Sequence, residues 1–322
     1  MDYLLQLPGT AQDIVLLLAV IAIKFVIAKL STPAQGNFFH FYCLQLANKV
    51  NKAHHSKRHK QIAGAIATLI TLIPIVVILW LFEQFIALPW LWSALLLYFS
   101  LGPMQLNAIA KQEAKYLADQ DKYQAKQLLA PFVLRDTEQL SPLGLIKASI
   151  EMLVLKSSQQ YIVISCCFLL FGPLVAFSYR MLLEMHYSWN IKRLEFNPFG
   201  QFVHQLVALA QWLPNRVMLL ALMLTSMSAA TLLHWRLIKC HLFRLNNDIL
   251  LGYFAYCLGI QLGGVAMYDR VKLRRVSFNQ QARQPEVKHI LLAIKQLNLV
   301  TTLLLGLLLS ILILVTIIKV NH

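Results

Sequence analysis

Charged side chains that could bind or convert a charged molecule gather in the middle of this chain. Arg135, Asp136 and Thr137 are consecutive, and Lys147 and Glu151 follow at a four-residue spacing that would place both on one side of a helix. Charged groups that recur between apolar segments of a membrane protein mark sites for charged molecules by default. A structural role for Arg135 and Asp136, pairing at a helix start, explains that pair about equally well.

The helix that would carry Lys147 and Glu151 has a clear start in the sequence. Ser141 suits the N-cap, and Pro142 suits the first helical position because its missing N–H would be unpaired there anyway. Apolar residues then recur at helical spacing, at Leu143, Ile146, Ile150 and Leu153. We therefore expect this stripe to face a core or a lipid surface, with the charged groups on a neighbouring face.

A second group of polar residues lies next to apolar segments further along the chain. The apolar run from Tyr161 to Leu183 contains Tyr179 and Arg180 and is interrupted by Gly172-Pro173, where proline kinks or breaks a helix. The run either crosses a membrane as a kinked helix or enters and returns as two half-helices. Arg216 precedes another apolar segment, where an interfacial anchor is the simpler role.

A third group follows near the C-terminus. Gly263 and Gly264 would allow close approach to the backbone, and the basic run after them, with Lys272, Arg274 and Arg275, could meet a phosphate. Loop residues followed by charge at the membrane surface are the simpler interpretation of the same pattern.

Composition indicates an integral membrane protein, because 58% of the residues are apolar and only 13% are charged. We predict an all-α fold with four transmembrane helices, at about 13–30, 62–82, 87–104 and 299–318. Two apolar segments, 161–183 and 217–233, are broken or marginal and either cross or re-enter the membrane. Mixed charges over about 106–130 predict an exposed cytoplasmic helix.

The distribution of charge predicts the orientation. The loop from Leu30 to Gln61 is basic, whereas the first twelve residues carry no Lys or Arg. Positive loops stay in the cytoplasm, so we expect a bacterial inner-membrane protein with a periplasmic N-terminus and a cytoplasmic central region. The net charge of +15 is then explained by anionic lipid headgroups, and nucleic acid is not an expected partner.

The corresponding domains would be a three-span region at 1–104, a motif-bearing region at 105–298 that is cytoplasmic or membrane-embedded, and a last helix at 299–322.

Histidine and cysteine give no strong signal for a metal site. The close histidines His54, His55 and His59 have no acidic or cysteine partner, so a solvated basic loop is favoured over a metal site. The five cysteines show no metal-ligand spacing. We predict no metal ligands.

The order of these motifs resembles the adenosylcobinamide-phosphate synthase family of cobalamin biosynthesis. The resemblance spans roughly residues 55–300. It begins with His59-Lys60-Gln61-Ile62-Ala63-Gly64, which resembles the segment before the family's second membrane helix, and it rests further on four groups of residues. These are Arg135-Asp136-Thr137, the helix with Gly144, Lys147 and Glu151, the segments Phe171-Gly172-Pro173 to Tyr179-Arg180 and Trp212-x-Pro214-x-Arg216, and Leu258 to Gly264 with Tyr268 and Arg283-Gln284-Pro285. The chain is also similar to the branch linked to β-lactamase induction.

The resemblance implies an enzyme that joins an aminopropanol-type amine, or its phosphate, to a corrinoid carboxylate as an amide, using ATP and Mg²⁺. In that interpretation Asp136 and Glu151 are catalytic and position Mg²⁺ or the amine, while Arg135 clamps phosphate or carboxylate. The further substrate-binding residues would be Thr137, Lys147, Tyr179, Arg180, Arg216, Gly263 and Gly264.

The chain also departs from the family's pattern. Leu155 and Lys156 replace a Glu-Asn pair, Gln159 replaces an Asp, and Ile164 and Val265 replace prolines. Lost carboxylates matter most for an enzyme that handles a Mg-nucleotide, because they hold the cation. The alternative is a non-enzymatic membrane sensor or regulator, with a regulatory protein as its partner in place of a corrinoid intermediate.

Overall fold

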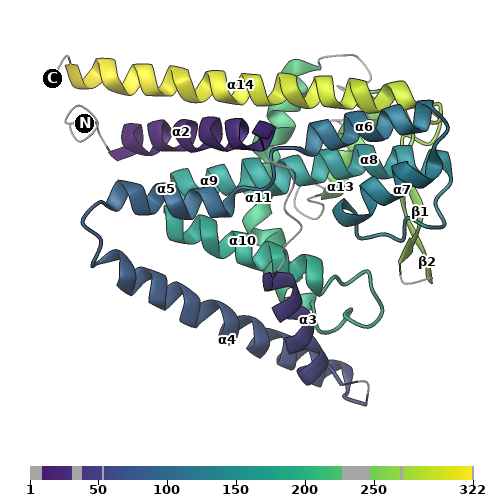
Figure 1. Cartoon of the computed structure of the whole chain (residues 1–322), viewed down its shortest axis with the longest axis horizontal. Coiled ribbons are helices and arrows are strands. Elements are labelled where there is room, and N and C mark those ends of the chain that lie inside the picture. The colour runs from purple at the N-terminus through teal and green to yellow at the C-terminus, as the bar shows by residue number, and fades with distance from the viewer. Residues whose placement is uncertain (1–8, 31–37, 53, 227–246, 269–270, 321–322) are drawn as a thin grey trace. The chain divides into compact units, whose positions relative to one another are not determined.

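The structure is a computed structural model that describes residues 9–30, 38–52, 54–226, 247–268 and 271–320 (Figure 1). In these residues the chain is largely helical, and two strands form an antiparallel hairpin. The elements are α2 (Gly9–Leu30), α3 (Phe38–Val50), α4 (Lys57–Glu83), α5 (Pro89–Ser100), α6 (Leu106–Ala118), α7 (Lys122–Leu129), α8 (Pro142–Ser157), α9 (Val163–Phe171), α10 (Pro173–Ser188), α11 (Gln201–Thr225), α13 (Asn247–Cys257), β1 (Leu262–Tyr268), β2 (Val271–Phe278) and α14 (Val287–Val320).

Four helices of the described chain are long and apolar enough to cross a membrane. They are Lys57–Glu83, Pro142–Phe171, Gln201–Thr225 and Val287–Lys319. The second is a continuous run of α8, a π-helical turn at Ser158–Ile162, and α9. This confirms an all-α integral membrane protein, to which the hairpin is a small addition.

The individual spans differ in part from those expected. The segments 62–82 and 299–318 lie within α4 and α14, and 13–30 lies within α2. In 87–104 the helix is only α5, whose 12 residues extend about 18 Å, less than the roughly 30 Å of a hydrocarbon core. The helix ends there because Leu101 is extended, with ψ 143°.

The broken segment 161–183 is resolved as a turn between two helices. Gly172 has φ +86° and ends α9, and Pro173 begins α10. The two helices pack against each other (Figure 1). The chain therefore reverses at Gly172-Pro173 and does not continue as one kinked helix. Of the other marginal segment, 217–225 completes α11, and 227–233 lies outside the described residues.

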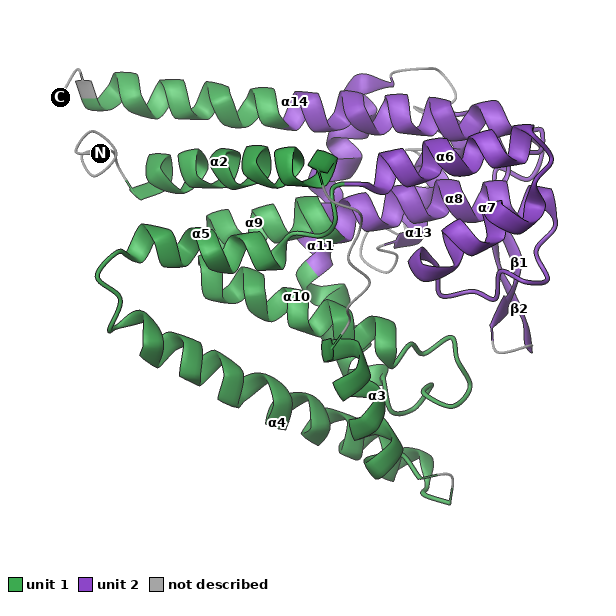
Figure 2. Ribbon diagram, viewed as in Figure 1, with its two compact units in different colours: residues 1–104, 160–210, 305–322 green, residues 105–159, 211–304 purple. Residues whose placement is uncertain are grey.

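The chain divides into two compact units, each made of segments that are distant in the sequence (Figure 2). Unit 1 comprises 1–104, 160–210 and 305–322, and unit 2 comprises 105–159 and 211–304. The apolar core of unit 1 includes Leu97, Phe168 and Trp189, from α5, α9 and the end of α10. Trp189 is fully buried, and its ring N–H donates to the carbonyl of Cys43 at 2.9 Å.

Unit 2 is organised around α8. Helices α6, α7 and α13 and strand β1 all contact α8, which is buried over most of its length. The expected exposed helix at 106–130 is instead two helices, α6 and α7. The break follows from Gln120, which has φ +62°, and from Asp121, whose carboxylate caps α7 by accepting the N–H of Gln124 at 3.0 Å.

The last difference in unit 2 is the β hairpin, at a position interpreted from the sequence as a loop. Strand β1 pairs with β2 from Leu262–Phe278 to Tyr268–Val271, with an irregularity between Gly263 and Val265. The hairpin matters because it supplies two of the groups that surround Glu151.

Candidate functional site

Glu151 is the centre of a buried polar cluster in unit 2. It lies on α8, whose start is as predicted: the Ser141 hydroxyl accepts the N–H of Gly144 at 3.1 Å, and Pro142 is the first residue of the helix. The Glu151 side chain is only 3% exposed. A carboxylate at such a position requires positively charged partners, because an isolated buried charge is very costly.

Two arginines and one backbone N–H supply those partners. Arg135 pairs with Oε2 of Glu151 through Nη2. Arg275, on β2, donates from Nη1 to Oε2 at 3.0 Å and from Nη2 to Oε1 at 3.4 Å. The backbone N–H of Gly263 donates to Oε1 at 3.2 Å. The carboxylate therefore accepts hydrogen bonds from three directions, and we call these four residues the Glu151 cluster.

The hairpin holds two members of the Glu151 cluster in place. Gly263 has φ +74°, and a Cβ there would collide with the carbonyl oxygen of Val276 on the facing strand, so only glycine fits. The N–H of Asp136 donates to the carbonyl of Met267 at 3.1 Å. This bond links the segment that carries Arg135 to strand β1. Arg275 lies on β2, which pairs with β1, so strand β1 holds both arginines beside the same carboxylate.

Within the four residues of the Glu151 cluster positive charge exceeds negative charge, and Asp248 on α13 is a second acid that acts on Arg275 from outside the cluster. Two guanidinium groups, with side chains 8% and 16% exposed, face one carboxylate. Burial alone would lower the pKa of Arg275, but the neighbouring Glu151 carboxylate raises it, so Arg275 stays charged. The Nε–H of Arg275 is buried and has no hydrogen-bond partner among the described residues. Buried donors normally have an acceptor, so this N–H is an exception within the described chain.

The same contacts decide what Glu151 itself can do. Its carboxylate is occupied by two guanidinium groups, so it is suited to positioning those groups and not to taking a proton from a substrate. The donor set also does not fit Mg²⁺, which prefers carboxylate and phosphate oxygens free of competing cations. Among the described residues, no group of three or more His, Cys, Asp or Glu side chains is placed to hold a metal ion.

The remaining predicted site residues of unit 2 lie in several environments. Thr137 is buried, while Asp136, Lys147 and Gly264 are half-buried. Arg216 folds along its own helix: its Nη1 donates to the carbonyl of Trp212 at 2.6 Å, and the guanidinium lies 4.6 Å from the centre of the Trp212 ring. The structure thus brings Arg135, Glu151 and Gly263 together.

Tyr179 and Arg180 belong to unit 1. Tyr179 is 2% exposed and is part of that unit's apolar core. Arg180 forms an ion pair with Glu184 one turn later on α10, at 2.5 Å.

Two polar residues with a clear place in unit 2 were missed in the sequence. Arg275 was counted with the surface charges, and because Arg274 and Arg275 are adjacent on β2 the sequence pattern does not show which of them faces inward. Glu113 was assigned to a solvated helix face but is fully buried. The signal for Glu113 was its position, because it continues the stripe of Ile109, Ala110 and Ala114 on α6.

Comparison with known proteins places the chain in a family. Residues 33–297 match the model of the family described as CobD/Cbib protein. The chain belongs to the CobD/Cbib family. This confirms the resemblance drawn from the motifs, and it makes the chain a divergent member, since the identities to its relatives are low.

Three curated relatives carry the name cobalamin biosynthesis protein CobD. The protein of Stutzerimonas stutzeri (strain A1501) is 25% identical over 227 residues, which cover 70% of this chain and 75% of the relative. That of Chromobacterium violaceum is 26% identical over 208 residues, covering 65% and 67%. That of Streptococcus sanguinis (strain SK36) is 27% identical over 214 residues, covering 65% and 67%. No solved structure matches the chain.

Proposed function

We propose that this CobD/Cbib protein acts in cobalamin biosynthesis as an amide-forming enzyme, joining an aminopropanol-type amine, or its phosphate, to a carboxylate of a corrinoid. The names of the relatives support the pathway. The observation that supports the reaction type is the Glu151 cluster, where two largely buried guanidinium groups share one carboxylate as their ion-pair partner. Both the corrinoid carboxylate and the amine phosphate are anions of the kind that arginine binds with its planar fork.

In this proposal each residue of the Glu151 cluster has a different role. Glu151 fixes the two guanidinium planes, and Gly263 fixes the carboxylate by its backbone N–H. Arg275 presents its unpaired Nε–H to an oxygen of the anion. Asp136, whose carboxylate has no ion pair to a described residue, is then the acid nearest in sequence to Arg135 and the group available to receive the ammonium of the amine substrate. ATP would supply the activation that a carboxylate needs before an amine can displace its oxygen.

The proposal is tested by complementation of a bacterium that lacks its own cobinamide synthase and receives cobyric acid as its only corrinoid. We expect growth with the wild-type chain and loss of growth with Arg275→Gln. The matched control is Arg274→Gln, because Arg274 is the exposed neighbour on the same strand. If the wild-type chain reaches the membrane in normal amount and does not support growth, while a curated relative does, the enzyme proposal is wrong.

The second candidate is a non-enzymatic membrane regulator with a protein partner. It is favoured by the same carboxylate: Glu151 is engaged in ion pairs, and the family's neighbouring acids are replaced by Leu155 and Gln159. A regulator would fail in complementation, and it would retain a protein partner captured by cross-linking in the cell. Loss of that partner in the Arg274→Gln variant, and not in Arg275→Gln, would place recognition on the outer face of the hairpin.

We also propose a bacterial inner-membrane location with a periplasmic N-terminus and a cytoplasmic central region. The support is the basic segment before and within the start of α4, at Lys52, Lys57, Arg58 and Lys60. An introduced cysteine at Ser56 should be protected from a membrane-impermeant thiol reagent in intact spheroplasts and labelled after lysis. Labelling before lysis would reverse the orientation.

A further inference from the structure

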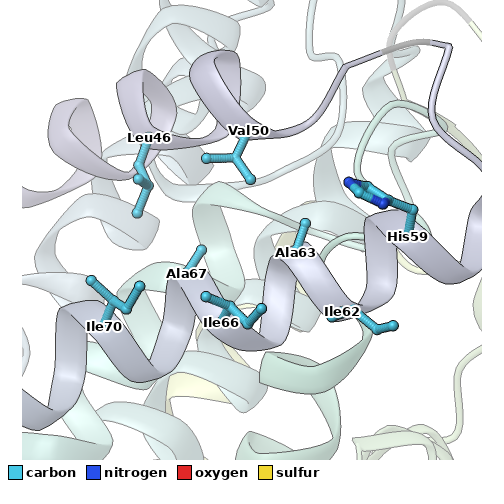
Figure 3. A pocket seen from close by; sticks show the side chains of 8 residues that line it. All are labelled: Leu46, Val50, His59, Ile62, Ala63, Ile66, Ala67 and Ile70. Carbon is cyan, nitrogen blue, oxygen red and sulfur yellow. The ribbon is translucent and has the colours of Figure 1, made fainter.

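An apolar groove in unit 1 lies between α3 and α4, away from the residues of the Glu151 cluster in the sequence (Figure 3). Its walls come from one short stretch of each helix, as Figure 3 shows. The residues that line it are Leu46 and Val50 on α3, with His59, Ile62, Ala63, Ile66, Ala67 and Ile70 on α4. His59 is at one end, and the other lining side chains are hydrocarbon.

The open side of the groove has the character of a surface that meets lipid. Ile62, Ile66 and Ile70 recur every four residues along α4 and are 52%, 50% and 64% exposed. The helix α4 is one of the four that are long and apolar enough to cross a membrane. A stripe of exposed isoleucines on such a helix is suited to contact with acyl chains.

The end of the groove at His59 is basic. The His54 and His55 rings lie 4.4 Å apart, and the His55 and His59 rings 4.2 Å apart, measured between centroids. The pKa of His55 is lowered by loss of hydration and by the charges of its neighbours, which include Lys52 and Lys60. No ion pair joins these residues to a described Asp or Glu. The lowered pKa favours neutral His55, so the positive charge at this end of the groove is that of Lys52 and Lys60, which no acidic side chain of the described chain balances.

We propose that the groove binds one acyl chain of an anionic phospholipid whose phosphate lies against His54, His55, His59, Lys52 and Lys60. A hydrocarbon channel that ends in a cationic cluster is complementary to an amphiphile with an anionic head. A free phosphate would not use the groove, and an uncharged lipid would not use the cluster. Anionic headgroups attract each nearby lysine strongly enough to change affinity about fivefold.

The test uses the full-length protein in phosphatidylcholine vesicles. A trace of phosphatidylglycerol with a photoreactive group midway along one acyl chain is cross-linked by light, and the labelled peptides are identified by mass spectrometry. The same experiment is run with photoreactive phosphatidylcholine. We expect label on Leu46, Val50 and the stretch from Ile62 to Ile70, with phosphatidylglycerol giving several-fold more than phosphatidylcholine. Equal labelling by both lipids would mean ordinary surrounding lipid and would overturn the proposal.

Two pairs of variants test separately the binding of the lipid headgroup and the binding of its acyl chain. Lys52→Gln with Lys60→Gln should reduce phosphatidylglycerol labelling fivefold or more, whereas the control Lys115→Gln with Lys122→Gln, at exposed positions in unit 2, should not. Ile66→Trp, in the groove wall, should reduce labelling by both lipids, whereas Ile73→Trp, exposed on α4 outside the groove, should not.

Each remaining outcome is decisive. Unchanged labelling in Ile66→Trp would show that the groove is not the site. Cross-links from the groove to a second copy of the chain, or to its own first eight residues, would show a protein occupant in place of lipid. The unfolding temperature of every variant should lie within a few degrees of the wild-type value, which excludes misfolding as the cause of reduced labelling.

Discussion

Unit 2 contains two buried glutamates on neighbouring helices, and they differ in their partners: one is paired with cations and the other is not. Glu151 on α8 accepts two guanidinium groups and a backbone N–H, and is charged. Glu113 on α6 is 0% exposed, and neither of its carboxylate oxygens has a hydrogen bond of normal geometry to a described residue. Burial raises the pKa of Glu113 to about 8, and the Ser149 hydroxyl beside it opposes only part of the rise.

The difference shows that burial alone does not identify a site. The polar groups brought to Glu151 come from three separate segments, the loop at Arg135, strand β1 and strand β2. Bringing these groups together requires specific backbone conformations, including a glycine with φ +74° at position 263. Glu113 has no such convergence, and at neutral pH it is held mainly as the neutral acid. Residues that assemble charge in this way are better candidates for binding than residues that are only enclosed.

The largest expected effect is on Glu151. Glu151→Gln removes the carboxylate with which both largely buried guanidinium groups pair, and we expect a loss of about 3–5 kcal/mol of unfolding free energy. Thermal unfolding of the detergent-solubilised protein measures it. Glu138→Gln, an exposed neighbour of the Arg135 segment, is the control and should change stability by less than about 0.5 kcal/mol. Recovery of part of the loss in Glu151→Gln with Arg275→Gln would confirm the pair, and a mild Glu151→Gln variant would contradict it.

The next largest effect concerns the backbone donor to Glu151. Gly263→Ala forces a side chain against the carbonyl of Val276 and should cost about 3 kcal/mol, with loss of the hairpin. Gly264 has φ +92°, but a Cβ there meets only ordinary contact with the Ser277 hydroxyl, so Gly264→Ala should cost about 1 kcal/mol. Cross-linking of cysteines placed at Met267 and Lys272 reports whether the strands remain paired. Equal effects of the two substitutions would show that the hairpin is not under this constraint.

Glu113 should make the stability of the protein depend on pH. Its folded-state pKa of about 8 is above the ordinary value of 4.5, so the stability it contributes is fully present below pH 4.5 and is lost as pH rises towards 8. Glu113→Gln removes the titration and should be more stable than wild type at pH 8.5, by on the order of 2 kcal/mol, and about equal at pH 5. Unfolding temperatures from pH 5 to 8.5 provide the measurement. A parallel pH dependence in variant and wild type would show that Glu113 is charged or hydrated in the folded state.

The smallest effect is expected for Lys147. It lies four residues before Glu151 on α8 and is half-buried, but no hydrogen bond or ion pair joins it to the cluster. Lys147→Gln should therefore change the unfolding free energy by less than about 0.5 kcal/mol. A loss of growth in the complementation assay at unchanged stability would assign Lys147 to substrate and extend the site by one cation.

Sequence patterns predicted the features that depend on local chemistry. The start of α8 followed from Ser141 and Pro142, and an interruption at Gly172-Pro173 followed from the effect of proline on a helix, although the sequence left open whether the chain bends or reverses there. Membrane character followed from composition. The helix start and the interruption are encoded within a few residues and the membrane character in the overall composition, so no knowledge of the fold was needed.

The remaining features depend on which distant segments meet. Arg274 and Arg275 are adjacent and chemically identical, and only the pairing of β2 with β1 decides that Arg275 faces Glu151 while Arg274 faces outward. The burial of Glu113 likewise depends on the packing of α6 against α8. A charged residue in an apolar stripe is read as exposed unless the partner surface is known, because burial of an unpaired acid is normally too costly.

The reversal at Gly172-Pro173 also has a consequence for how the protein is made. Helix α10 has 16 residues, about 24 Å, and carries Arg180 and Glu184, so it is too short and too polar to partition into lipid alone as it leaves the ribosome. Its apolar partner α9 is synthesised immediately before it, and the glycine at φ +86° lets the two fold back on each other at once. We therefore expect the insertion machinery to release α9 and α10 as one hairpin, with Gly172 as the residue that permits the reversal.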